Sequence, residues 1–296
     1  LPWKQRDDLP RVLKAHRTAQ PLSDEEAQAW KQTLATLDVR WDTYAQQAMD
    51  TITVDPQLSV EDRGAWLLII QQMQTHWNEH LRDALAAAAE SSELTPEQQA
   101  TLTSFSALFD EMSLERVEDG TVVSWPADTH AWFRLCEKLQ GQSAEQLAAA
   151  DAPRLGHLQL SQQPDEHRGQ LVKIRGIAPY PYRVPAPKNI LGIEEYFMFT
   201  VFPRRGPSTP ILVYALEIPA GFPVAKEGAQ GDDARLSAQL QEVEFVGYSF
   251  KQCAYASLGG TEVAPLVLAR RPQWSPKSAA AVAQPPSWWM IAAAVA

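Results

Sequence analysis

The hydrophobic pattern of this chain changes its period once, at His167–Gly176, and this change constrains the fold more than any other feature. Before this stretch, apolar residues recur at steps of three and four, the spacing of one helical face. Within it, Val172 and Ile174 alternate with Lys173 and Arg175, as in a β-strand with one polar face. The sequence therefore predicts an α+β protein with a helical first part and a strand-rich second part.

The helices of the first part begin at recognisable capping residues. Ser23 and Thr95 each stand three residues before a Glu or Gln, which is the capping-box spacing. Ser59 starts a second helix that should run to about residue 90, and Asp128 should cap a fourth over 129–139. The expected apolar stripes are Trp30, Leu34, Leu37, Trp41 and Tyr44 in the first helix, and Trp66, Ile69, Ile70, Met73, Trp77, Leu81 and Leu85 in the second.

Five short strands are predicted in the second part, at 171–177, 196–202, 211–218, 243–255 and 265–269. Gly176 and Gly247 are the expected bulge positions, and 178–189 reads as a proline-rich loop. Five strands with an irregular connection between the third and fourth match the order of an OB-like β-barrel. A small sandwich or an SH3-like barrel would give a similar pattern.

The C-terminal residues predict a membrane anchor. Residues 275–286 have linker composition, and Trp288 and Trp289 then open an uncharged apolar run, as the water–bilayer boundary favours. Ten residues cannot span a bilayer, so we expect the start of a transmembrane helix; an apolar tail packed on protein is the alternative. The predicted organisation is an N-terminal extension (1–20), an acidic helical domain (21–155), an OB-like β-barrel domain (156–274), a Pro/Ala linker (275–286) and the start of the anchor (287–296).

Charge is divided unevenly along the chain. Residues 1–150 carry 24 acidic and 12 basic side chains, whereas residues 151–274 carry 12 acidic and 13 basic. An acidic first half argues against that half binding nucleic acid or an anionic lipid surface. The neutral second half neither supports nor excludes a polyanionic ligand.

No catalytic or metal-binding signature stands out. His76 and His80 have a spacing that metals use, but without HExxH order or a third ligand they read as a polar helix face. A serine in G-x-S-x-G context is absent from the sequence, which disfavours acyl transfer. Cys136 and Cys253 read as two buried thiols, with one disulfide joining the halves as the alternative. We therefore expect no enzyme activity, no metal and no cofactor.

Several short motifs resemble a group of membrane-anchored proteins from planctomycete-type bacteria that carry an OB-like domain. The matching stretches are Asp165–Gln170 leading into Val172–Gly176, then Gly247–Lys251 with Tyr255, and Ala264–Arg270. That group has Gly-Tyr-Phe-Phe-Lys in the fourth strand, so Ser249 departs from the pattern. The likeness runs from about Thr95 to the end of the chain. It implies an OB-like module on the extracytoplasmic (periplasmic) side, tethered by a helix, and carries no catalytic residues with it.

Aromatic and basic residues on or beside the predicted strands are the candidate interface or ligand face. OB barrels stack bases on such aromatics and neutralise phosphates with Arg and Lys, although aromatics must also fill the barrel. We expect Lys251 to reach water or to pair with Glu242 or Glu244. The candidate set is Tyr180, Tyr182, Arg183, Arg204, Arg205, Tyr248, Phe250, Lys251 and Tyr255, with Trp288 and Trp289 at the membrane boundary.

These observations lead to three hypotheses. The first is a non-catalytic, membrane-anchored, extracytoplasmic subunit that docks onto other subunits of a membrane-associated assembly. Its motivation is the absence of a chemical signature, the tryptophan-led apolar tail and the many aromatics suited to interfaces. The second is an OB-type module that binds single-stranded nucleic acid or a glycan, although nucleic acid is the less expected partner. The third is an enzyme whose site a partner completes, and no sequence feature favours it.

Overall fold

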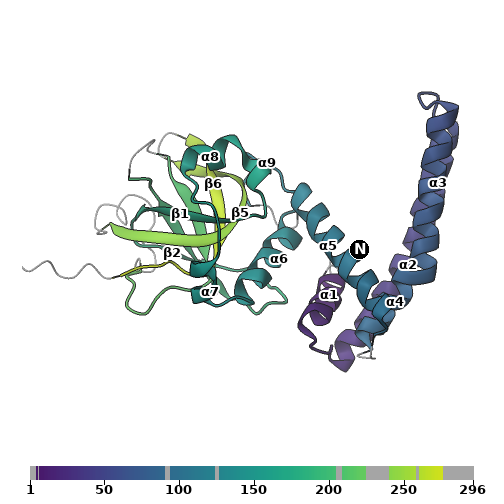
Figure 1. Cartoon of the computed structure of the whole chain (residues 1–296), viewed down its shortest axis with the longest axis horizontal. Helices are drawn as coiled ribbons and strands as arrows, with labels where there is room; N and C mark the ends of the chain where they lie inside the picture. Colours follow the sequence, from purple (N-terminus) through teal and green to yellow (C-terminus); the bar gives the residue numbers. More distant parts are fainter. Residues whose placement is uncertain are drawn as a thin grey trace, which may run out of the picture. The chain divides into compact units, whose positions relative to one another are not determined.

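The computed structural model describes residues 5, 7–90, 94–123, 127–204, 209–224, 240–257 and 260–275. The chain divides into two compact units, residues 1–116 and residues 117–296. The first unit is helical and the second is built on a β-sheet (Figure 1). The predicted α+β composition is therefore confirmed, and each unit is described by itself below.

The first unit is a long helical hairpin with shorter helices around one of its ends (Figure 1). We call the hairpin of α2 and α3 the helical arm. Its turn lies at Asp55–Ser59, and the opposite end of the arm is its base. The elements of this unit are α1 (Asp8–Thr18), α2 (Asp24–Val54), α3 (Val60–His76), a π-helical turn η2 (Trp77–Leu81), α4 (Arg82–Ala89) and α5 (Pro96–Glu115).

The core of the first unit lies at the base of the arm. Trp30 is 1% exposed and donates its indole N–H to the carbonyl of Leu85, at 3.0 Å. The Ser23 and Thr95 capping boxes are both present, as predicted. The helix expected from Ser59 to about residue 90 is present as α3 and α4, which are joined directly by the π-helical turn η2. Buried apolar residues of this core include Val12, Leu13, Trp30, Leu34, Trp77, Leu81, Leu85 and Leu102.

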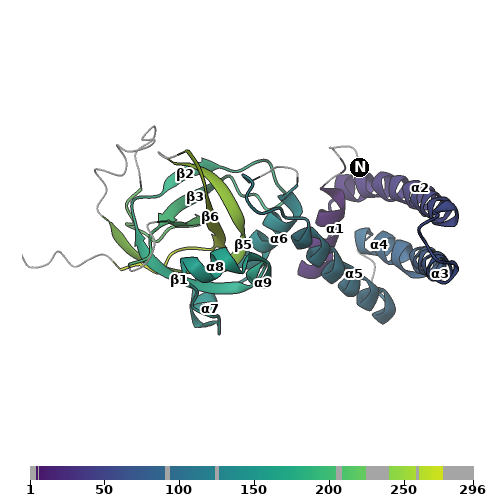
Figure 2. The same cartoon turned by 90° about the horizontal axis from the view of Figure 1, so that it is seen from above.

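The second unit combines a mixed sheet with four helices that lie against it (Figure 2). Helices α6 and α7 lie within the predicted helical domain (21–155), but they pack on strands β5 and β6. The elements are α6 (Thr129–Gln140), α7 (Ala144–Ala149), α8 (His157–Gln162), α9 (Pro164–His167), β1 (Leu171–Ala178), β2 (Tyr182–Pro185), β3 (Glu195–Val201), β4 (Ile211–Ala215), β5 (Gln241–Ser257) and β6 (Gly260–Ala269).

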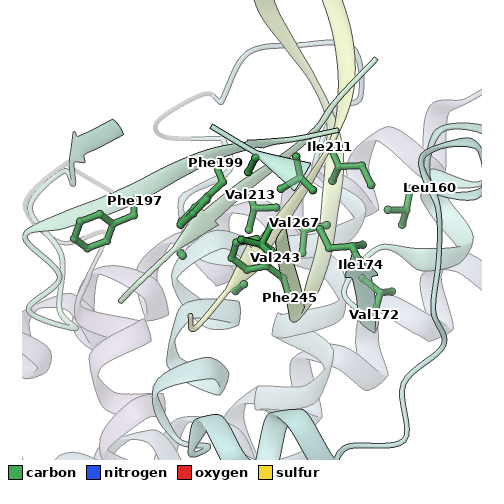
Figure 3. Packing of buried hydrophobic residues seen from close by; sticks show 14 of the residues in the cluster. Leu160, Val172, Ile174, Phe197, Phe199, Ile211, Val213, Val243, Phe245 and Val267 are labelled. Atoms are coloured by element: carbon green, nitrogen blue, oxygen red, sulfur yellow. The ribbon is translucent and has the colours of Figure 1, made fainter. Parts of the chain in front are cut away.

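The strands run in the order β1-β5-β6-β4-β3-β2. The β4–β6 pair is parallel and the other pairs are antiparallel. Side chains from several strands meet in one core, where the Phe199 and Phe245 rings lie 5.0 Å apart (Figure 3). Leu160 of α8 closes this core at one side.

The predicted five-stranded OB-like barrel is wrong, because the described strands form an open sheet of six. The extra strand is β2, which lies inside the stretch expected to be a proline-rich loop and pairs with β3. Its Pro185 is tolerated because β2 is an edge strand, where a missing N–H costs no ladder bond. Between β1 and β3 the described residues form one isolated bridge, Ile177 to Phe202, instead of a ladder that would close a barrel.

The predicted bulges at Gly176 and Gly247 are also wrong. Both glycines sit in unbroken register between β1 and β5, opposite Val243 and Val172 respectively. They are needed for close approach, because an added Cβ would overlap a backbone carbonyl oxygen, of Phe202 at Gly176 and of Leu268 at Gly247. The register shift of β5 lies instead between Ser249 and Lys251.

The predicted transmembrane helix is not found. Across the described ranges, no helix combines the length and the apolar character needed to cross a bilayer. Trp288 and Trp289, the expected membrane-boundary residues, lie outside the described residues. The membrane-anchored, extracytoplasmic location that rested on this helix is therefore not retained.

Candidate functional site

The predicted aromatic and basic residues do not gather on one face. Tyr180, Tyr182 and Arg183 lie at or beside the β2 edge, where Arg183 pairs with Glu195 at 2.7 Å. Its guanidinium also lies 5.4 Å from the centre of the Phe197 ring, a cation–π distance. This group is a partly exposed patch whose single arginine already has an anionic neighbour.

Two further members of the predicted set are engaged elsewhere in the second unit. Arg204 forms an ion pair with Glu242. Tyr255 donates its hydroxyl to Glu262 at 2.8 Å, on the neighbouring strand β6. Arg205 lies outside the described residues. Neither contact creates a surface shared with the β2 edge.

The remaining three, Tyr248, Phe250 and Lys251, are covered by helices. Their exposed fractions are 9%, 0% and 3%, so they cannot present a stacking face to a ligand. Tyr248 lies beneath Lys138 of α6, whose ammonium is 5.9 Å from the ring centre. These residues belong to the packing between β5 and α6.

Lys251 forms a buried ion pair that the sequence did not indicate. Its Nζ lies 3.0 Å from Oδ2 of Asp128, and the two side chains are 0% and 1% exposed. The ammonium also donates to the hydroxyl of Thr121 at 2.8 Å and to the carbonyl of Val122 at 3.3 Å. All three N–H groups therefore have acceptors. The predicted partners, Glu242 and Glu244, pair instead with arginines.

A β-bulge explains this geometry. Phe250 and Lys251 are neighbours on β5, and a regular strand would point them to opposite faces. The bulge turns both toward the start of α6, where Phe250 meets Trp132 edge-on, with ring centres 5.4 Å apart, and Lys251 meets Asp128. Asp128 precedes α6 as predicted, but its carboxylate makes no side-chain cap bond there.

Arg168 secures the other side of the bulge. It donates to the carbonyl of Phe250 at 2.8 Å and pairs with Asp119 and Asp165, each at 2.7 Å. Burial works against the charged guanidinium, but the hydrogen bonds that it donates to the two carboxylates outweigh this effect and raise the pKa of Arg168. Asp165 lies three residues before Arg168, whereas Asp119 lies 49 residues before it, a distance in sequence that no local pattern indicates.

The chemistry around Trp132 is that of a packed core. The Trp132 indole donates to the Tyr196 hydroxyl at 2.9 Å, and the Tyr214 ring lies edge-on at 5.1 Å. Burial raises the pKa of Tyr214 to about 12 and raises the pKa of both cysteine thiols. The cysteines are buried and not disulfide-bonded, which confirms the first of the two predictions for them. Buried, protonated thiols are poor nucleophiles, so this cluster stabilises the fold.

A hollow of about 420 Å³ lies beside α7 and residues 270–275 of the second unit. Its arginines are already paired, Arg271 with Glu145 at 3.0 Å and Arg270 with Glu217 at 3.1 Å. An anionic ligand would have to displace a carboxylate at either position. The hollow therefore offers a mixed polar surface instead of a preformed anion site.

The helical arm shows a different kind of surface. Along its length α2 and α3 meet by an inner seam with alternating three- and four-residue steps, as in a two-stranded coiled coil. The ring centres of Trp41 and Trp77 lie 5.8 Å apart in this seam. Near the turn of the arm, Arg63 of α3 donates to the carbonyl of Ile52 of α2 at 3.1 Å. The less exposed seam residues are Trp41, Ala45, Ala48 and Ile52 of α2 and Arg63, Leu67, Ile70, Gln74 and Trp77 of α3 and η2.

A second seam runs along α3 into η2 with the same spacing, and among the described residues no further helix covers its α3 part. Trp66, Ile69 and Met73 are its apolar members, and they are 50%, 43% and 49% exposed. Each of the 17 residues of α3 keeps part of its surface in solvent. We call this the outer seam, and its residues are Asp62, Trp66, Ile69, Met73, His76 and His80.

The outer seam ends beside a shallow hollow of about 380 Å³. Its His76 and His80 rings lie 5.5 Å apart, and Nδ1 of His80 is 3.2 Å from Oε1 of Glu97. Within the described part of the chain, no cluster of three or more His, Cys, Asp or Glu side chains could hold a metal ion. The π-helical turn at Trp77–Leu81 follows at this point, and such turns often occur at functional positions.

The apolar residues of the outer seam are visible in the sequence, but they were assigned to one stripe together with those of the inner seam. The stripe predicted for this helix merges two seams: Ile70, Trp77 and Leu81 face the arm or the base, whereas Trp66 and Ile69 lie one position earlier in the repeat. Two overlapping 3-4 repeats, offset by one residue, make an apolar face too wide for one neighbouring helix to cover.

No protein-family model and no curated protein sequence matches the chain. The resemblance to the planctomycete-type group therefore stays a prediction.

Proposed function

We propose that the chain is a non-catalytic subunit that docks onto another subunit of a protein assembly through the outer seam of its helical arm. The observation that carries the proposal is the exposure of Trp66, Ile69 and Met73 in regular 3-4 spacing on a helix without buried residues. Single exposed apolar residues are ordinary, but a contiguous apolar stripe on a surface marks an interaction site.

The composition of the stripe supports protein binding. Aromatic residues and Met are enriched in protein interfaces, whereas charged residues are depleted at their centres. From Gly64 to Gln74 the sequence of α3 is free of Asp, Glu, Lys and Arg. A buried Trp or Ile side chain contributes roughly 1.5–3 kcal/mol, so three such residues supply enough apolar area for the centre of an interface.

The alternative, a binding face for single-stranded nucleic acid or a glycan on the sheet, has weaker support. Its central candidates, Phe250 and Lys251, are buried against α6. The acidic character of the arm also disfavours a polyanion as the ligand of the first unit.

Affinity purification from cells of the source organism tests the proposal. The tagged chain is compared with Ile69→Glu, which places a charge in the outer seam, and with Val39→Glu as a matched control. Val39 is 68% exposed on α2, outside both seams, so the same change there should leave binding intact. We expect one or more proteins to co-purify with the wild type and with Val39→Glu, and to be depleted at least tenfold with Ile69→Glu. A chain that purifies alone, or the same recovery with all three forms, contradicts the proposal.

A further inference from the structure

We infer that the occupant of the outer seam is a single amphipathic α-helix whose apolar heptad stripe is flanked at both ends by Lys or Arg. This inference rests on the proposed function and specifies the chemistry of the partner. It follows from the spacing of the seam, from its position beside the inner seam, and from the distribution of charge around it.

The spacing of the outer seam indicates a helical occupant. From Asp62 to His80 the steps are four, three, four, three and four, the repeat that lets a neighbouring helix pack knobs into holes along its whole length. A β-strand or an irregular loop does not match this period. At 1.5 Å per residue the seam is about 27 Å long, which corresponds to about five turns of a partner helix.

The other wall of the docking surface comes from α2. In an antiparallel helix pair, residues one position before the seam residues on the two helices lie on the same side. Trp66 and Met73 precede the seam residues Leu67 and Gln74, and Tyr44 likewise precedes Ala45. Tyr44 is 63% exposed, so the third helix would lie between α2 and α3 with apolar contacts on both. The product is a three-helix coiled coil.

Charge around the seam specifies the flanks of the occupant. Asp62 stands at one end of the seam, and Glu97 lies beside His80 at the other, with 75% of its side chain exposed. Over residues 38–80 the arm carries seven acidic and two basic side chains. A partner helix with an apolar centre and cationic ends would therefore meet complementary charge at both ends.

The same charges disfavour a second copy of the chain. Two outer seams packed in parallel would place Asp62 against Asp62 and Glu97 against Glu97. Packed antiparallel, they would place Asp62 of each copy near Glu97 of the other. Both arrangements bring like charges together at the ends of the interface, which costs free energy.

Two synthetic three-heptad peptides test the inference on the full chain. Both carry Leu and Ile at the core positions, and one has two Lys at each end where the other has two Glu. Binding of the fluorescently labelled peptides is measured by anisotropy at low and at physiological salt. We expect the Lys-flanked peptide to bind at least tenfold more tightly, with the difference shrinking as salt screens the end charges. Ile69→Glu should abolish this binding, and Val39→Glu should leave it unchanged.

Each other outcome overturns the inference. Equal affinity for the two peptides contradicts the predicted preference for Lys or Arg at the ends of the partner helix. Equal effects of Ile69→Glu and Val39→Glu contradict binding at the outer seam. Light scattering that shows a dimer of the chain, lost on Ile69→Glu, assigns the seam to a second copy. If neither peptide binds while co-purification still depends on Ile69, the docking function stands and the helical, basic-flanked partner does not.

Discussion

Replacing the buried Lys251–Asp128 pair tests how the second unit holds α6 on its sheet. Lys251→Met keeps the length of the side chain and removes its charge, leaving a carboxylate buried without its counter-charge. With side chains 0% and 1% exposed, neither ion can recover its hydration in place. Breaking a buried pair from one side costs about 3–5 kcal/mol, so we expect a loss of that size from the free energy of unfolding of the second unit.

The double-mutant cycle separates the pair from the packing around it. Asp128→Leu alone should cost about as much as Lys251→Met, because it leaves the ammonium buried. The double variant should cost less than either single change, since an apolar pair of similar volume needs no desolvation of charge. Thr121 and Val122 lose a donor in the double variant, which keeps it from full recovery.

The measurement has to report on the second unit alone, because a chain of two units need not unfold in one step. Hydrogen exchange in increasing urea, read by mass spectrometry on peptides from β5 and β6, gives that local free energy. The matched control is Arg154→Met, which breaks an exposed 3.0 Å pair with Glu244. Since the Arg154 side chain is 59% exposed, we expect that change to cost less than about 1 kcal/mol. A Lys251→Met loss no larger than this control, or a double variant as costly as the two single losses added, would refute the reasoning.

Three further perturbations address the glycines, the buried phenol and the helix caps. Gly247→Ala should destabilise β5 by more than about 2 kcal/mol, because the added Cβ overlaps a carbonyl of β6. Gly64→Ala, at an open position near the start of α3, should stabilise the arm by about 0.5–1 kcal/mol, and urea denaturation compares the two variants. Burial raises the pKa of Tyr214 from 10.0 to about 12, so the folded state holds this proton more tightly, and the contribution of Tyr214 to the stability of the second unit falls by roughly 3 kcal/mol between pH 10 and pH 12. Tyr214→Phe should flatten that part of the pH–stability profile, and an unchanged slope would contradict the assignment. Ser23→Ala should lower the helicity and the stability of the first unit by about 1 kcal/mol, measured by circular dichroism during thermal unfolding.

Local signals in the sequence predicted the elements better than their assembly. Ser23 and Thr95 fixed two helix starts, since a capping box satisfies backbone donors within four residues. The alternation at Val172 and Ile174 likewise predicted β1. Strand β2 was missed because its prolines and polar neighbours have loop composition, and an edge strand needs only one partner to be stable. Closure of the sheet depends on pairing between distant strands, which no local pattern encodes.

Contacts between side chains that are distant in the sequence were likewise not predicted. Lys251 was expected to reach water or to pair with Glu242 or Glu244, whereas its partner is Asp128, which lies 123 residues away in the sequence. Only the bulge after Ser249 brings them together, and the glycine expected to make a bulge, Gly247, makes a close strand contact instead. The outer seam was visible as apolar residues, yet the sequence could not show which of them α2 would cover.

The weakness of the inner seam and the exposure of the outer seam have a common explanation. A two-helix arm is stabilised by the apolar area that the two helices bury between them. The inner seam contains Ala45, Ala48 and Gln74, which bury little apolar area. The largest apolar side chains of α3 beyond the base, Trp66 and Met73, lie outside it. Two helices in this arrangement cannot cover their own apolar surface, whereas a third helix between them would bury both sets at once. The distribution of side-chain size along α3 is thus the one expected of a bundle that a partner helix completes.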